Sequence, residues 1–195
     1  TFEILPRRVT VRADAVSKTY GETDLELTYV CEGLLDGDTL SGALVRELGE
    51  HAGSYAIGLG TLADPNYEIE FSGADFTIEK RKVTVRADAA SKTYGDADPA
   101  LTYTADGLIG GDVLSGALSR ETGEDAGKYA VLPGTLSHPD YTIEFVSAEF
   151  TVNRRTLIVR VTPGQGKTFG EEDGVLLFSA EGLLEGDDPG FRLVR

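Results

Sequence analysis

The chain has 195 residues, of which 41% are hydrophobic, and it carries a formal net charge of −15 with a pI near 4.5. Such acidity argues against nucleic acid as a partner, because binding to phosphates requires a basic face that releases counterions. No apolar run reaches the length of about 18 residues that a transmembrane helix needs, and the single cysteine, Cys31, excludes an internal disulfide or a thiolate zinc site within one chain.

A repeat with a spacing of 74 residues organises the sequence. About 45 of the 74 positions from Arg8 to Arg81 match their counterparts in the second copy without a gap. In chain order, residues 1–7 resemble the last strand of a preceding copy, residues 8–81 and 82–155 form two repeat units, and residues 156–195 form a truncated third unit. The sequence has neither a methionine nor a signal-peptide pattern, so we expect it to be a piece of a longer array.

Hydrophobic and polar residues alternate within each repeat, which is typical of strands with one face on a core and one in water. In the second copy this pattern predicts five strands, at residues 82–93, 100–106, 113–121, 127–136 and 141–152, the last with a bend near Val146 and Ser147. Glycine-rich turns separate them, and residues 107–114 have room for one short helical turn. The prediction is an all-β fold of tandem small domains, each an Ig-like sandwich or a β-grasp-like curved sheet.

The junction between the two complete copies is short. Only Glu79-Lys80-Arg81-Lys82 joins the last strand of the first copy to the first strand of the second, without Gly or Ser. Such a junction predicts an elongated, semi-rigid rod. Cations occupy this place in every copy, as Arg7-Arg8, Arg81-Lys82 and Arg155; they are either solvated linker charges or partners of acidic turns in the neighbouring repeat that fix the angle between domains.

Eight short motifs follow one another in the second copy. They are SKTYG at 91–95, LTY at 101–103, GLIGGD at 107–112, LSGAL at 114–118, GKYAV at 127–131, GTL at 134–136, DYTIEF at 140–145 and FTV at 150–152. In this order they resemble the MBG domain of the YGX type, over nearly the whole chain. The resemblance implies a tandem array in a bacterial cell-surface or adhesin-like protein, and it implies no catalytic or binding residues. The third copy departs from the pattern, with Phe169 in place of Tyr20 and Tyr94.

No catalytic, cofactor-binding or metal-ligating residue is expected, and the chain is not expected to be an enzyme. The segment Gly164-Gln165-Gly166-Lys167-Thr168 resembles the end of a phosphate-binding loop but lacks the first glycine of that motif. The two histidines occupy non-equivalent positions, since His51 aligns with Asp125 and His138 with Asp64. They are therefore interpreted as unrelated residues of surface loops.

Acidic turns occur at the same place in all three copies, as Asp36-Gly37-Asp38, Gly111-Asp112 and Glu185-Gly186-Asp187-Asp188. Calcium prefers oxygen ligands from such loops, but the spacing of a calcium-binding loop is missing, which favours carboxylates that accept hydrogen bonds from the backbone. A covalent cross-link between Lys18 or Lys92 and a buried carboxyl group is a further alternative.

Two sets of recurring side chains are candidates for ligand binding. The aromatic set alternates as inward strand residues do, which favours a core over a sugar-binding shelf; it comprises Tyr20, Tyr29, Tyr55, Tyr67, Phe71 and Phe76. The arginine set suits either an exposed binding surface or structural ion pairs across strands; it comprises Arg12, Arg86 and Arg160, and the pair Arg46 and Arg120.

These observations favour a structural repeat array, a stalk or spacer of a bacterial extracellular surface adhesin, at the cell surface or secreted. The alternative is an adhesive module that binds a host glycan, mucin or protein directly. A spacer predicts that exposed positions differ between copies, as Glu26 and Ala100 do. The expected partners are neighbouring repeats of the same chain and, through the parent adhesin, a host glycan or protein.

Overall fold

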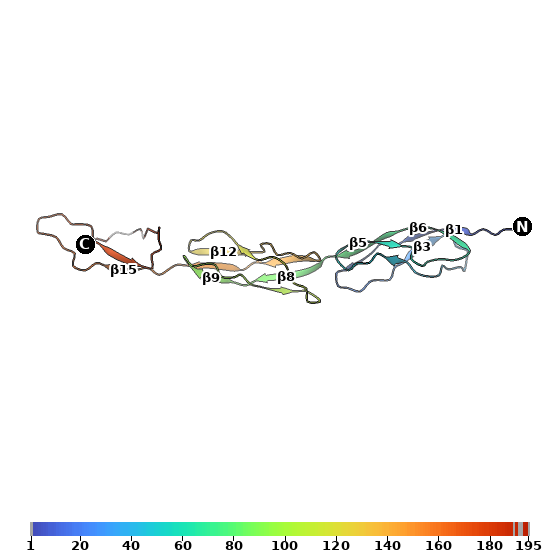
Figure 1. The fold of residues 1–195 in the computed structure, drawn as a ribbon, viewed down its shortest axis with the longest axis horizontal. Coiled ribbons are helices and arrows are strands. Elements are labelled where there is room, and N and C mark those ends of the chain that lie inside the picture. Colours follow the sequence, from blue (N-terminus) through green and yellow to red (C-terminus); the bar gives the residue numbers. More distant parts are fainter. Residues whose placement is uncertain (1, 189, 191–192, 195) are drawn as a thin grey trace. The chain divides into compact units, whose positions relative to one another are not determined.

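The computed structural model describes residues 2–188, 190, 193 and 194 of the chain. Every regular element in this part of the chain is a β-strand, sixteen in all, which confirms the all-β fold (Figure 1). No helix among the described residues is long and apolar enough to cross a bilayer.

The first sheet of the first repeat has three strands in the order β3-β1-β6. β1 (Arg7–Ala13) lies in the centre, antiparallel to β3 (Tyr29–Glu32) and parallel to β6 (Tyr67–Ser72). Buried and exposed side chains alternate along β1, because successive strand residues point to opposite faces. Apart from Val30, which is 54% exposed, the outward-facing residues of β1 and β3 are polar.

The second sheet of the first repeat has four strands in the order β2-β7-β5-β4. β2 (Val16–Thr19) is parallel to β7 (Ala74–Glu79), which is antiparallel to β5 (Gly53–Gly58); β5 in turn pairs with the two-residue β4 (Val45–Arg46). β1 leads into β2 and β6 leads into β7. The first and last long strands of the repeat thus run parallel in both sheets.

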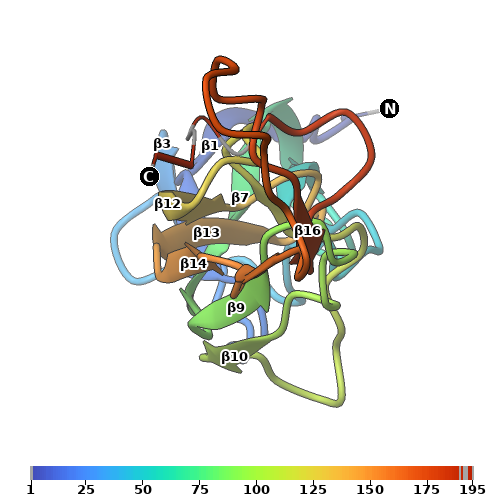
Figure 2. The ribbon, with the colours of Figure 1, turned by 90° about the vertical axis from the view of Figure 1, so that its left-hand side faces the viewer.

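The second repeat has the same two sheets. One consists of β10 (Tyr103–Asp106), β8 (Arg81–Ala87) and β13 (Tyr141–Val146). The other consists of β11 (Ser119–Arg120), β12 (Gly127–Leu132), β14 (Glu149–Asn153) and β9 (Ala90–Thr93), of which Figure 2 labels β9, β12 and β14. In the third copy, β15 (Ile158–Val161) is antiparallel to β16 (Phe178–Glu181).

The prediction of five strands per repeat was wrong, because two of the predicted strands are each divided. Residues 82–93 form β8 and β9, since Asp88 leaves the ladder: its N–H donates to Thr102 O (2.9 Å) and its carboxylate accepts from the Thr102 hydroxyl (2.7 Å). Residues 141–152 are interrupted at Ser147, whose hydroxyl donates to a carbonyl oxygen of β12 (2.7 Å). The bend predicted at this point is confirmed.

The other three predicted strands are shorter than expected. Residues 100–106 are extended only from β10 onward, and residues 127–136 only as far as the end of β12. Residues 113–121 retain the two-residue β11, because Gly116 has a φ of 94° and ends the extended run. Residues 107–114 contain a hydrogen-bonded turn and no helix.

Residues 2–6, which align with the last strand of a preceding copy, form no strand; residue 1 lies outside the described residues. In the complete repeats the equivalent strand lies between two partners, as β7 lies between β2 and β5. No such pair flanks residues 2–6 in the described part of the chain. The exposed side chains of Phe2 and Ile4 reflect this.

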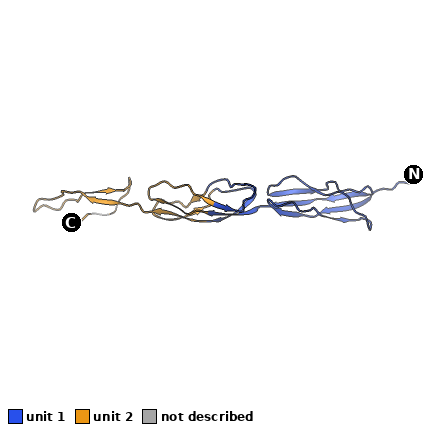
Figure 3. Cartoon of the chain, turned by 90° about the horizontal axis from the view of Figure 1, so that it is seen from below, with its two compact units in different colours: residues 1–86, 104–117, 135–146 blue, residues 87–103, 118–134, 147–195 orange. Residues whose placement is uncertain are grey.

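The chain divides into two compact units that do not follow the repeat boundaries (Figure 3). The first unit comprises residues 1–86, 104–117 and 135–146, and so holds the whole first repeat and one sheet of the second. The second unit comprises residues 87–103, 118–134 and 147–195. The boundaries at residues 8, 82 and 156 therefore remain a description of the sequence repeat.

Equivalent residues are buried in the two repeats. In the first repeat the fully buried side chains include Val11, Ile57, Phe76 and Ile78, which belong to one core cluster. Their counterparts in the second repeat, Val85, Val131, Phe150 and Val152, are buried to the same degree. The core of the first repeat is small, so each large side chain in it carries a considerable share of the stability.

Replacement of Phe76 by Ala should lower the free energy of unfolding by about 3 to 5 kcal/mol, because it removes buried apolar surface and leaves a cavity. Urea denaturation of the full chain measures this. Leu48→Ala is the matched control, since Leu48 is 98% exposed and its loss should change the unfolding free energy by less than about 0.5 kcal/mol. Equal effects of the two substitutions would contradict the position of the core.

Candidate functional site: ion clusters and repeat contacts

A cluster of four charged side chains lies beside the core of the first repeat. Lys18 of β2 and Arg46 of β4 are the cations, and Asp24 and Glu50 come from the loops that follow these strands. Lys18 Nζ contacts Asp24 Oδ1 (2.6 Å) and Glu50 Oε2 (2.7 Å), while Arg46 contacts the other oxygens of the same carboxylates (2.6 and 2.5 Å). Each carboxylate therefore bridges both cations. We call this arrangement the first ion cluster.

Both cations of the first ion cluster are buried against an aromatic ring. Their side chains are only 2% (Lys18) and 10% (Arg46) exposed, and the Arg46 guanidinium carbon lies 4.8 Å from the centre of the Phe76 ring. Arg46 also donates to the carbonyl oxygens of Glu47 (2.8 Å) and Gly49 (2.7 Å). The cluster thus joins two loops to the edge of the core, with the charges paired and hydrogen-bonded as burial requires.

The second repeat has an equivalent second ion cluster of Lys92, Asp98, Arg120 and Glu124. Lys92 Nζ lies 2.7 Å from Asp98 Oδ1 and is also bonded to Glu124, and Arg120 contacts both carboxylates at 2.6 Å. The recurrence of Arg46 and Arg120 therefore has a structural explanation in ion pairs, although the partners lie in loops and not across strands. Arg12, Arg86 and Arg160 are exposed.

The clusters favour the charged forms of their members. The hydrogen bonds from Arg46 and Lys18 lower the pKa of Asp24 to about 2, and those from Arg120 and Lys92 lower the pKa of Asp98 to about 2. Burial lowers the pKa of Lys18, but its bonds to the carboxylates outweigh burial and the pKa lies above the ordinary value. The stabilisation by Asp24 and Asp98 is present above their ordinary pKa of 3.8 and is lost as the pH falls toward 2.

The charged forms of the lysines and carboxylates in the two clusters disfavour a covalent cross-link at Lys18 or Lys92. Formation of an amide needs a neutral amine as nucleophile and a protonated carboxyl group that loses water. Each cluster stabilises the ammonium and carboxylate forms instead. The clusters are networks of ion pairs that hold loops of one repeat to its core.

The acidic turns accept hydrogen bonds from tyrosine hydroxyls. Tyr67 donates to Asp38 Oδ2 (2.5 Å) and accepts from the backbone N–H of Leu35 (3.1 Å). Tyr141 makes the equivalent bonds in the second repeat, to Asp112 Oδ2 (2.7 Å) and from Ile109 N–H (3.0 Å). The predicted backbone donor is present in the third turn, where Gly190 N–H donates to Asp188 Oδ1 (2.9 Å), whereas Asp38 and Asp112 accept from tyrosine hydroxyls. Among the described residues, no group of three or more His, Cys, Asp or Glu side chains is arranged to hold a metal ion.

The aromatic set belongs to the core. Phe76 and Tyr67 are buried, and the other four rings pack partly buried against the same cluster. This confirms the prediction of core residues.

The turn after β2 contacts Ile109, Asp112 and Tyr141 of the second repeat, and both sides of this contact lie within the first compact unit. Tyr20 donates from its hydroxyl to Asp112 Oδ2 (3.2 Å), and its ring stands edge-on to Tyr141, with 5.5 Å between the ring centres. Gly21 lies so close to Ile109 that a Cβ atom there would be 1.9 Å from the Ile109 Cδ1 atom. Arg81 donates to the Tyr20 carbonyl oxygen (3.4 Å). We call this the first repeat contact.

Residues at equivalent positions form a second repeat contact, which lies within the second compact unit. Tyr94 donates to Asp187 Oδ1 (2.9 Å), and a Cβ atom at Gly95 would lie 2.2 Å from Leu184 Cδ1. Arg155 donates to the Tyr94 carbonyl oxygen (3.2 Å) and forms an ion pair with Asp96 (3.2 Å). Arg155 and Asp96 both lie in residues 82–155, so this ion pair is not the predicted pairing with an acidic turn of a neighbouring repeat.

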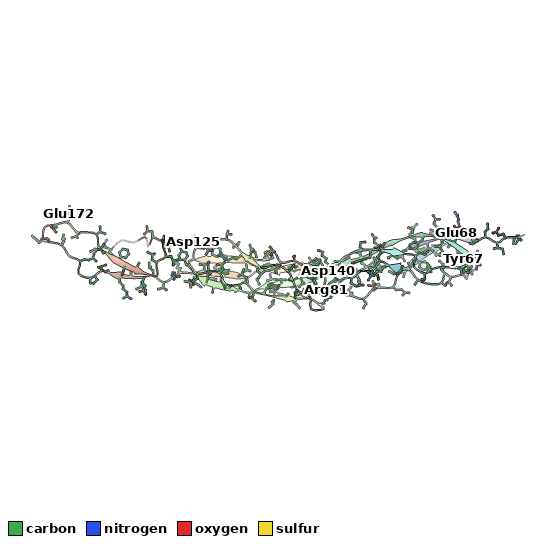
Figure 4. All side chains as sticks on the ribbon, in the orientation of Figure 1. Tyr67, Glu68, Arg81, Asp125, Asp140 and Glu172 are labelled. Atoms are coloured by element: carbon green, nitrogen blue, oxygen red, sulfur yellow. The ribbon has the colours of Figure 1, made fainter. Side chains whose placement is uncertain are left out.

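The first repeat contact also contains the buried carboxylate of Asp140, which is labelled in Figure 4. Asp140 is 1% exposed; its Oδ2 lies 2.8 Å from His51 Nδ1, and its Oδ1 accepts from the Ala52 N–H (2.7 Å). His138 Nδ1 lies 3.9 Å from the same carboxylate. The interpretation of the histidines as residues of surface loops fits His51, whose side chain is 80% exposed, but not His138, whose side chain is 16% exposed; both lie beside the same carboxylate, which the sequence did not indicate. Only the tertiary structure brings them together, since they come from different loops of different repeats.

Comparison with family models gives two matches to one family, described as MBG domain (YGX type), at residues 9–77 and 83–151. Together these segments cover more than half of the chain. No curated protein matches the chain.

Replacement of Asp24 by Ala should lower the free energy of unfolding by about 1 to 3 kcal/mol, because Lys18 and Arg46 stay buried with one carboxylate between them. The measurement is urea denaturation of the full chain at pH 7. Glu26→Ala is the control, since the second repeat has Ala100 at this exposed position. If the two variants are equally stable, the cluster does not hold the loops.

Replacement of Tyr20 by Phe should cost about 0.5 to 1.5 kcal/mol of unfolding free energy, the usual value of one hydrogen bond. Tyr29→Phe is the matched control, because the Tyr29 hydroxyl has no hydrogen bond among the described residues. Thermal and urea denaturation of both variants measure the difference. A Tyr20→Phe protein as stable as the control would mean that the hydroxyl adds nothing to the contact.

Proposed function

The chain belongs to the MBG domain (YGX type) family, and on this basis we propose that it is a structural repeat array, a stalk or spacer, of a bacterial extracellular surface adhesin. The observation that carries the proposal is the recurrence of one contact. Tyr20-Gly21 packs on Ile109 and Asp112, and Tyr94-Gly95 packs in the same way on Leu184 and Asp187. A stalk built from repeats needs an equivalent contact at every junction, because each repeat is held only by the repeats next to it.

The distribution of polar groups supports a mechanical role. Of the buried charged side chains among the described residues, Lys18 and Lys92 are paired within their own repeats in the two ion clusters, and Asp140 is bonded to His51 in the first repeat contact. No buried side-chain nitrogen or oxygen in this part of the chain lacks a hydrogen-bond partner. The net charge of −15 favours solubility and repulsion between separate molecules. In this proposal the chain is not an enzyme, and it lies at the cell surface or in the medium.

A second candidate function is direct adhesion to a host glycan, mucin or protein. The observation in its favour is that Arg12 of β1 and Arg86 of β8 are exposed at equivalent positions of the two repeats. Beside Arg12 there is a depression of about 100 Å³, lined also by Thr10, Val30 and Glu32. An exposed cation that recurs in each repeat gives an array several equivalent contacts with an acidic partner.

Small-angle X-ray scattering of the full chain, with and without calcium, tests the stalk. We expect a long and narrow particle whose dimensions do not change when calcium is added, because the acidic turns are occupied by tyrosine hydroxyls. A compact particle would contradict the spacer role. Stiffening by calcium would show that the turns bind metal, and the proposal would then need revision.

A further inference from the structure

The Tyr-Gly part of the first repeat contact recurs in the second. The first contact has a further part, in which His51 of the first repeat meets Asp140 of the second. The residues aligned with these two differ: Asp125 stands at the position of His51 in the second repeat, and Asn66 at the position of Asp140 in the first. The position of His51 therefore holds an imidazole in one copy and a carboxylate in the other.

The environment of Asp140 makes its partner important. The carboxylate is almost completely buried, so its charge must be compensated by the groups that face it. From the first repeat these are the His51 imidazole, the Ala52 N–H and the Tyr20 ring system; from the second they are His138, Tyr141 and Asp112. Asp112 is itself an anion and accepts from both tyrosine hydroxyls. His138 Nδ1 accepts from the Asp140 backbone N–H (3.2 Å), so the imidazole that faces the Asp140 carboxylate as a hydrogen-bond partner is that of His51, whose side chain is 80% exposed.

We propose that His51 and Asp140 are a neighbour-matching pair, which favours the first repeat in front of the second and disfavours the pairing of copies in the wrong order. A second repeat in front of another second repeat would place Asp125 against the buried Asp140, two carboxylates with no cation between them. A first repeat in front of another first repeat would place His51 against the neutral Asn66. The inference rests on the array function proposed above, because it concerns the partner that each repeat accepts.

The need for such matching follows from the similarity of the copies. β6 and β13 share most of their sequence, and each pairs parallel with the first strand of its own repeat. Adjacent domains of similar sequence are prone to exchange equivalent strands while they fold. A difference in charge between His51 and Asp125 at the contact distinguishes the correct neighbouring repeat from one whose strand has been exchanged.

The pair also gives the contact a dependence on pH. The hydrogen bond with Asp140 raises the pKa of His51 above its ordinary value of 6.5. Burial raises the pKa of Asp140, but the bonds from His51 and Ala52 outweigh burial and hold it below its ordinary value of 3.8. The stabilisation by His51 is fully present below pH 6.5 and is lost as the pH rises through its raised pKa; that by Asp140 is present above pH 3.8 and is lost in stronger acid.

A double-mutant cycle on the full chain tests the pair. His51→Asp, Asp140→Asn and the double variant are compared with the parent chain by urea denaturation at pH 6. We expect His51→Asp to raise the unfolding equilibrium constant at least fivefold, and Asp140→Asn to reverse at least half of this loss, on a logarithmic scale, in the double variant. Asp125→His, the opposite exchange at the aligned position, should change the constant by less than twofold.

An NMR titration of the histidines provides a second measurement that does not depend on the stability of His51→Asp. The pKa of His51 should lie above 6.5 in the parent chain and return toward 6.5 in Asp140→Asn. If the effects of the two substitutions are additive and the His51 titration is the same in Asp140→Asn as in the parent chain, the matching pair is overturned, whatever the shape of the particle in scattering. If scattering shows a compact particle but the cycle is not additive, the stalk is overturned and the matching pair stands.

Discussion

The parallel pairing of the first and last long strands sets the positions of both ends of each repeat. Because β2 runs beside β7 in the same direction, the turn that follows β2 lies at the end of β7, where Tyr20 N–H donates to Glu79 O (2.9 Å). Because β6 runs beside β1, the loop before β6 lies at the start of β1, and in the second repeat Arg81 N–H donates to Asp140 O in the same way (2.9 Å). Only Lys80 separates β7 from β8, so the turn of one repeat meets the loop of the next.

The same pairing explains why each repeat needs an ion cluster. β2 and β4 are the edge strands of the four-stranded sheet and are only four and two residues long, and the segments after them are loops. A core of this size cannot hold such loops by apolar contact alone. Lys18 and Arg46 extend the core as charged side chains that lie near the Phe76 ring, and Asp24 and Glu50 bring the loops to them. The recurrence of the cluster at Lys92 and Arg120 shows that it belongs to the architecture of the repeat.

The division of the first repeat contact into a recurring Tyr-Gly part and a part that differs between copies suits an array built from similar units. Tyr-Gly fits any neighbour that has an aliphatic residue and an aspartate in its acidic turn, as Ile109 with Asp112 and Leu184 with Asp187 show. It therefore secures attachment without selecting a neighbour. Selection requires a residue that differs between copies, and the buried Asp140 has this property because an unmatched buried charge is costly.

The sequence by itself determined the all-β class, the 74-residue repeat and the aromatic core, because strand periodicity and duplication are local patterns that can be read along one chain. It also located the bend at Ser147 and the recurrence of Arg46 and Arg120. Only the tertiary structure decided the division into seven strands, since Asp88 leaves the ladder through a bond to Thr102, fourteen residues away. It alone decided the partners of the buried groups: Lys18 with Glu50, Tyr20 with Asp112, and His51 with Asp140 join residues 32 to 92 positions apart. Such pairs depend on how strands align in space, and that alignment is not contained in any single segment.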